Sequence, residues 1–166
     1  DRKSYSLGID YSTQKTSIGT DFEARFDNVK STSGSDDRKT YVSKTKVSSK
    51  LDEQWRVLAK FNFSISDSSR GDYFDGDYKE GVLGLAYRPI NNDRLNFLFK
   101  YRYYEMLPSS GQIDSDGNTP EFQQRDHILS ADAIWDVSNP FSLGLKYAVD
   151  FSQLRNNRTG TGPWFS

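Results

Sequence analysis

The chain contains no cysteine and only one histidine, His127, among its 166 residues. The absence of cysteine excludes disulfide bonds, thiolate nucleophiles and cysteine-ligated metal sites within this sequence. A zinc site or a Ser-His-Asp triad would have to be built around His127 alone. We therefore expect no metal, no other cofactor and no catalytic residue.

The chain also has no excess of charge of one sign and no long hydrophobic run. Lysine and arginine number 22 against 23 aspartates and glutamates, for a net charge of −1. No global field would recruit nucleic acid, so nucleic acid is not an expected partner. No stretch approaches the ~18 consecutive apolar residues of a transmembrane helix. That observation does not exclude a membrane β-barrel, because alternation spreads its lipid-facing residues among polar ones.

Aromatic residues are abundant, at 14% of the chain, and they recur with a period of two. In residues 94 to 106, RLNFLFKYRYYEM, every second residue forms an aromatic face, while Lys100 and Arg102 lie on the other face. Side chains alternate between the two faces of a β-strand, so this pattern predicts strand and not helix.

The same alternation predicts eight strands, in a single all-β domain that covers residues 1 to 166. The pattern is weakest in residues 39 to 51. Short connections at 13 to 15, 52 to 54, 89 to 93 and 137 to 140 alternate with long ones at 28 to 38, 67 to 78 and 107 to 125, which predicts an antiparallel up-and-down meander. The expected strands are residues 4–12, 16–27, 39–51, 55–66, 79–88, 94–106, 126–136 and 141–153.

Strands in which apolar and polar residues alternate in this way occur in two classes of protein. A soluble β-sandwich or lipocalin-like ligand-binding barrel turns its apolar face inward, whereas a transmembrane β-barrel turns it outward to lipid. The expected strands are longer than the usual five or six residues of globular proteins, and they suit the roughly 9 to 11 residues of a tilted membrane strand. Strand length and the alternation of short and long connections favour the transmembrane barrel.

The position of the aromatic residues points the same way. They cluster near both ends of the expected strands with Leu, Val and Ala between them, as expected for two headgroup interfaces. We expect the following residues to face lipid or to belong to these aromatic belts: Tyr11, Trp55, Tyr87, Phe97, Phe99, Tyr101, Trp135 and Phe141.

The charged residues of the opposite face separate by sign. The predicted lumen-lining basic residues are Lys44, Lys46, Lys50, Arg56, Lys60, Arg88, Lys100 and Arg102, and the predicted lumen-lining acidic residues are Asp10, Asp21, Glu23, Asp27, Asp132, Asp136 and Asp150. These charges could create a field across a water-filled pore. They could instead pair with one another and plug a narrow barrel. Both interpretations stay open at the level of sequence.

Two segments add a family resemblance. GLAYRPINNDRLNFLFKYRY at residues 84 to 103 and HILSADAIWDVSNPFSLGLKYAV at residues 127 to 149 resemble the barrel-forming portion of large bacterial outer-membrane proteins, in a likeness that covers about residues 79 to 166. The resemblance implies residence in the bacterial outer membrane, with outer-membrane lipid as a partner. It implies no catalytic residue.

The expected topology also bears on the extent of the barrel. If the short turns are periplasmic, both ends of this sequence lie on the extracellular side, whereas complete bacterial barrels have both ends in the periplasm. We therefore expect part of a larger barrel, with GPWFS (162 to 166) starting another strand; a closed eight-stranded barrel is the alternative. The expected function is a porin-like passive pore, or the membrane anchor and translocator of a larger surface assembly of other domains or chains.

Three motifs could instead carry chemistry. His127 would be the central residue of an outer-membrane lipid-modifying enzyme, which is a remote alternative to a non-enzymatic barrel. DYFDGD (72 to 77) and DSDGN (114 to 118) carry alternate acidic residues, but they lack the glutamate spacing of an EF-hand loop. We interpret both as solvated turns and not as metal sites.

Overall fold

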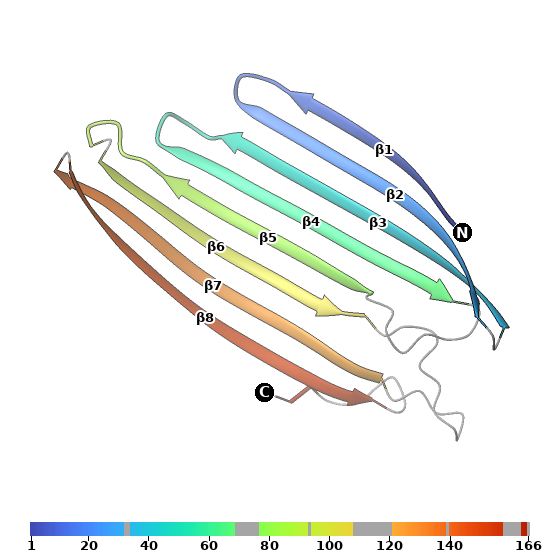
Figure 1. Cartoon of the computed structure of the whole chain (residues 1–166). Helices are drawn as coiled ribbons and strands as arrows, with labels where there is room; N and C mark the ends of the chain where they lie inside the picture. The colour runs from blue at the N-terminus through green and yellow to red at the C-terminus, as the bar shows by residue number, and fades with distance from the viewer. Residues whose placement is uncertain are drawn as a thin grey trace.

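The computed structural model describes residues 1–31, 34–68, 77–92, 94–107, 121–138, 140–157 and 164–165. Every strand pairs antiparallel with its neighbours in sequence, in one sheet of order β1 to β8 (Figure 1). The predicted all-β class and meander are confirmed. The strands are β1 (Arg2–Ser12), β2 (Thr16–Ser31), β3 (Gly34–Lys50), β4 (Trp55–Ser68), β5 (Tyr78–Tyr87), β6 (Leu95–Met106), β7 (Glu121–Ser138) and β8 (Phe141–Asn157).

Several strands are longer than the alternation predicted. The long connection expected at residues 28 to 38 is wrong, because β2 and β3 stay paired as far as Ser31 and Gly34. β7 likewise starts at Glu121 and β8 continues to Asn157. Backbone ladder hydrogen bonds do not require apolar side chains, so a polar hairpin can extend beyond an apolar band.

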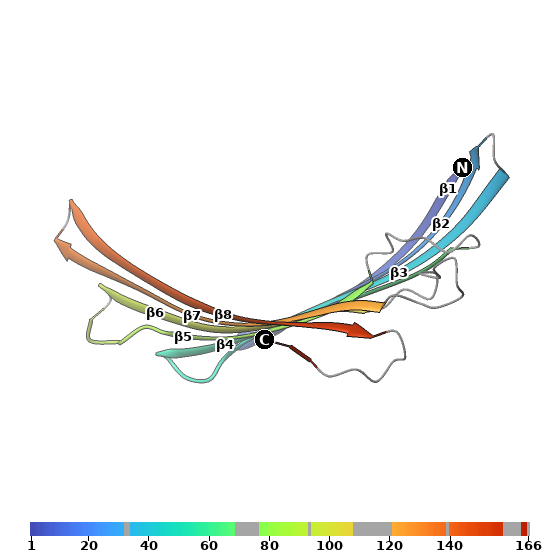
Figure 2. The same ribbon diagram turned by 90° about the horizontal axis from the view of Figure 1, so that it is seen from below.

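The sheet is curved, and it is open. Figure 2 shows its two sides rising from the middle of the sheet. β1 and β8 form the two edges, and within the described residues they do not pair with each other. These eight strands therefore do not close on themselves as the eight-stranded alternative required. The described residues form no helix that is long and apolar enough to cross a membrane.

The strand registers keep most of the apolar residues of all eight strands on one side. Leu85 of β5 lies opposite Val57 of β4 and Phe99 of β6, and Phe99 lies opposite Ala131 of β7. The register shifts only at the end of β7, between Asp136 and Ser138. The result is a two-faced sheet. One side is an apolar face, and the other is a polar face that carries most of the charges.

Candidate functional site

The apolar face is almost entirely uncovered. Leu145 exposes 70% of its surface and Leu7 exposes 65%, although both side chains are hydrophobic. Among the described residues, Val42 is the one buried hydrophobic side chain, and it lies on the polar face. Soluble monomers rarely expose large contiguous apolar patches, so this face is a candidate interaction surface.

Aromatic rings line the apolar face at both ends of the strands. Near the short turns, the ring centroid of Tyr87 lies 4.4 Å from that of Trp55 and 6.4 Å from that of Phe97. Near the other end, Phe26 makes edge contacts with Tyr5 at 6.2 Å and with Tyr41 at 6.4 Å. The structure places every sequence-predicted belt residue on the apolar face: Tyr11, Trp55, Tyr87, Phe97, Phe99, Tyr101, Trp135 and Phe141.

A polar rim, which the sequence analysis missed, borders the apolar face at the end away from the short turns. Lys79 of β5 forms an ion pair of 2.7 Å with Glu105 of β6, and Arg125 of β7 donates a hydrogen bond of 2.6 Å to Gln153 of β8. Lys79 and Arg125 come two positions before the same-face residues Gly81 and His127, and Glu105 and Gln153 come two positions after Tyr103 and Phe151. That change from apolar to polar within an unbroken alternation is the signal that could have located this rim.

His127 belongs to the same face, just inside this rim. Its Nδ1 lies 2.8 Å from the hydroxyl oxygen of Tyr101, and its ring centroid lies 5.0 Å from that of Tyr103. Asp126 lies on the polar face, where it accepts hydrogen bonds from Ser152 and Gln124. The adjacent histidine and aspartate therefore do not form a catalytic pair.

The candidate metal sites are mostly outside the described residues. Residues 72 to 76 and 114 to 118 are among those not described, and Asp77 accepts hydrogen bonds from the backbone N (2.6 Å) and the Oγ (2.8 Å) of Ser66. Within the described part of the chain, no three His, Asp or Glu side chains gather closely enough to hold a metal ion.

On the polar face, the register brings the predicted basic residues of β3 to β6 together. Lys46 lies directly opposite Lys60, and Lys50 lies directly opposite Arg56. Like charges at directly opposed positions destabilise a sheet. Of the described basic residues, Lys46, Lys50, Arg56, Arg88 and Lys100 form no ion pair with a described carboxylate.

Glu80 is the carboxylate within this basic region, and the sequence pattern did not predict its role. Its side chain is only 12% exposed. It accepts hydrogen bonds from Arg102 Nε at 2.7 Å, from Asn62 Nδ2 at 2.5 Å and from Lys60 Nζ at 3.4 Å. Arg102 also lies over the ring of Tyr104, 5.4 Å from its centroid. Glu80 therefore links β4, β5 and β6 across the polar face.

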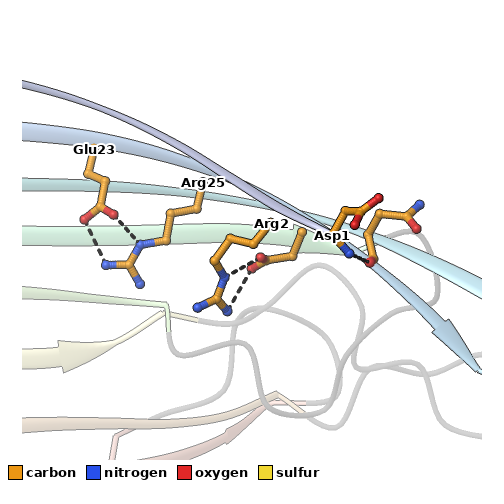
Figure 3. Close-up of polar contacts among 6 residues, drawn as sticks. Asp1, Arg2, Glu23 and Arg25 are labelled. Atoms are coloured by element: carbon orange, nitrogen blue, oxygen red, sulfur yellow. Dashed lines mark hydrogen bonds and ion pairs between the residues drawn. The ribbon is translucent and has the colours of Figure 1, made fainter.

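The predicted acidic region is also partly neutralised, by arginines of its own strands. Arg2 binds Asp27 at 2.6 Å and Arg25 binds Glu23 at 2.6 Å (Figure 3). The Asp27 side chain is 13% exposed in this pair, whereas that of Arg2 is 70% exposed. Asp10 lies beside Gly19, where a Cβ would come within 2.6 Å of its Oδ1, so the glycine makes room for this carboxylate.

The remaining predicted acidic residues occupy the same face on β2, β7 and β8. Asp132 forms a loose ion pair of 3.8 Å with the exposed Lys146. Asp21 lies beside Gly8, whose Cβ would be 3.0 Å from its Oδ1. Asp136 and Asp150 lie opposite Ser142 and Ile128, respectively. The register thus places the basic residues on β3 to β6 and the acidic ones on β1, β2, β7 and β8, with Asp21 directly opposite Lys44 where the two regions meet. Neither region is free of counter-charges.

A hollow of about 1500 Å³ lies at the short-turn end of the polar face. It spans the sheet from Lys50, at the end of β3, to Lys146 of β8. Basic, acidic and apolar side chains all line it, among them Arg56, Leu98 and Asp132. Because its shape depends on the curvature of the sheet, alternation alone could not reveal it.

We expect Glu80→Gln to destabilise the protein by about 1 to 3 kcal/mol, because charge-assisted hydrogen bonds from three donors are weakened. Asp132→Asn is the matched control and should cost at most about 1 kcal/mol, since Lys146 is 77% exposed. Urea unfolding of both variants measures the difference. Equal stability of the two variants would contradict a linking role for Glu80.

Comparisons with known proteins leave the family open. No protein-family model and no solved structure matches the chain. Over 106 residues, it is 30% identical to the postreplication repair E3 ubiquitin-protein ligase RAD18 of Candida glabrata. That alignment covers 64% of this chain and 23% of the ligase, so the chain spans about a quarter of the length of this relative.

Proposed function

We propose that the sheet is part of the wall of a transmembrane β-barrel of the bacterial outer membrane. Its apolar face contacts lipid, and its polar face lines an aqueous interior. The barrel serves as a passive pore, or as the membrane anchor of a larger surface assembly. One observation carries this proposal: the registers extend a single exposed apolar face across all eight strands.

The dimensions of the apolar face support this assignment. On β6 and β7 the apolar positions run from Leu95 to Tyr103 and from Trp135 to His127, which is nine residues on each strand. A membrane strand needs about 9 to 11 residues when tilted, and the lipid-facing band of a barrel is flanked by aromatic girdles. The aromatic rows, followed by the polar rim at Lys79 and Glu105, have this arrangement.

The edges of the sheet support a barrel larger than these eight strands. β1 and β8 are 11 and 17 residues long, and such edges promote aggregation unless other strands pair with them. Phe165 pairs with Leu154 of β8 in an isolated antiparallel bridge. The neighbouring Trp164 lies 4.1 Å below the guanidinium of Arg125. We propose that further strands continue the sheet from its edges to close the barrel.

The competing function is a soluble ligand-binding barrel, in which the apolar face would be the core. Tyr147 and Ala148 separate the two models, because they are neighbours on β8 that point to opposite faces and both are exposed. The three native tryptophans are replaced by phenylalanine, and Tyr147→Trp and Ala148→Trp are then made one at a time. Each variant is folded with vesicles that contain lipid brominated at mid-chain.

We expect brominated lipid to quench the fluorescence of Tyr147→Trp, and iodide to quench that of Ala148→Trp. This pattern follows from one face in hydrocarbon and one in water. A soluble barrel would show no lipid quenching at either position, and that result would contradict the proposal. The similarity to the ubiquitin ligase suggests no second function, since it covers 23% of that protein.

A further inference from the structure

The hollow on the polar face combines a basic rim with an apolar floor. The basic residues of its rim lie where the β1–β2 turn, the β3–β4 turn and the end of β5 meet. The backbone N of Lys50 donates to the carbonyl of Lys15 at 2.8 Å, and the backbone N of Arg88 donates to the carbonyl of Gln54 at 2.9 Å. Arg56 lies directly opposite Lys50. Lys15, Lys50, Arg56 and Arg88 therefore gather at one side of the hollow.

The carboxylates that line the hollow do not neutralise this rim. Asp52 uses its Oδ1 to accept the backbone N–H groups of Gln54 and Trp55, both at 2.7 Å. Asp132 pairs with Lys146 on the opposite side. With Glu53, these are three carboxylates against five cations, which leaves a net charge of +2. A bound anion would relieve the repulsion between the opposed Lys50 and Arg56.

The floor of the hollow is apolar, which is unusual for the polar face. Leu58, Ala86, Leu98 and Ile134 come from four successive strands, and Leu58 and Ile134 are 37% and 50% exposed. Apolar side chains left uncovered beside a basic rim suit a ligand that has both kinds of surface.

We propose that this hollow binds an amphipathic carboxylate. Its anionic group pairs with Lys50, Arg56 and Arg88, and its hydrocarbon body lies on Leu58, Leu98 and Ile134. The site would lie within the lumen of the proposed barrel, near the short-turn mouth, so this inference rests on the proposed function. It specifies the class of solute that the pore binds.

Hexanoate is the probe, measured by equilibrium dialysis against the full-length protein in lipid nanodiscs, with empty nanodiscs as the blank. We expect saturable binding of hexanoate, and binding of acetate and of hexanol that is at least about tenfold weaker. Acetate lacks the hydrocarbon body and hexanol lacks the charge. Equal binding of hexanol and hexanoate would overturn the proposal.

Two variants locate the site. Arg56→Gln combined with Lys50→Gln should weaken hexanoate binding at least about tenfold. Gly144→Leu should abolish it, because Gly144 lines the hollow and a Cβ there meets no atom within 4 Å, so the new side chain fills the space without a clash.

The matched controls lie outside the hollow. Gly81→Leu also adds a side chain where nothing lies within 4 Å, and Lys100→Gln removes an equivalent cation. Both should leave the affinity within about twofold. Binding that survives Gly144→Leu would overturn the proposal.

Flotation of the same protein with vesicles separates this inference from the proposed function. Protein that floats but does not bind hexanoate refutes the inference alone. Protein that does not float refutes the membrane barrel, and hexanoate dialysis of that protein without nanodiscs then decides whether the hollow is a binding site.

Discussion

Leu145→Arg should destabilise the folded protein in lipid vesicles by about 2 to 4 kcal/mol, which is the cost of a cation near the midplane on the lipid face of a barrel. Leu145 lies in the middle of the apolar positions of β8 and is 70% exposed within the sheet. In water, a substitution at such an exposed position would cost within about 0.5 kcal/mol. A large cost therefore requires that an apolar environment, either lipid or a protein core, cover this face.

Ala148→Arg is the matched control, because it adds the same side chain to the same strand on the polar face. We expect it to cost less than about 1 kcal/mol. Urea titrations in vesicles measure both variants. Similar costs at the two positions would contradict the assignment of one face to lipid. The tryptophan pair at residues 147 and 148 distinguishes a lipid contact from a protein core.

The number of strands and the residues that share each face could be predicted from sequence, because both follow from the period of two. Phe97, Phe99 and Tyr101 alternate with Leu98 and Lys100 so regularly that helix is excluded. The ends of the strands could not be predicted in the same way. From Asn28 to Ser31 the sequence becomes polar, and alternation no longer separates a solvated strand from a loop.

The contacts between charges could not be predicted, because they depend on register. Glu80 lies directly opposite Asn62 and Tyr104, and it reaches Arg102 diagonally across the β5–β6 pair. A shift of one residue would turn Glu80 to the other face. The pattern gives the face of each charge but not its partner, so it could not show that Lys60 and Arg102 both bind Glu80.

The curvature of the sheet could likewise not be predicted from the sequence. Residues from the end of β3 to β8 line the hollow, among them Lys50 and Lys146, so it depends on how these strands are arranged in space. In a barrel, curvature depends on the number of strands and on their stagger, neither of which is encoded in the alternation of a single strand.

Replacing both Lys46 and Lys100 by glutamate should shift the selectivity of the full-length protein toward cations in planar-bilayer recordings. Both cations lie on the polar face, and neither forms an ion pair with a described carboxylate. The shift should be large at 0.1 M salt and small at 1 M, because the screening length falls from about 10 Å to about 3 Å.

Folding should survive this double change. Lys46→Glu converts a like-charge pair with Lys60 into an opposite-charge pair, which contributes roughly 0.2 to 1 kcal/mol in a sheet. Lys100 lies opposite Gly84 and Ser130, so no carboxylate is stranded there. Lys60 itself is a poorer choice, since it binds Glu80.

The matched control reverses two exposed cations that align with the apolar face, Lys3 and Lys39. This change alters the net charge by the same amount but leaves the polar face intact, so the selectivity should not move. A shift of equal size in the control would mean that net charge, and not the polar-face lysines, sets the selectivity. Wild-type protein that inserts into the bilayer but conducts no ions would contradict the proposed pore function. The membrane anchor would then be the remaining proposed function.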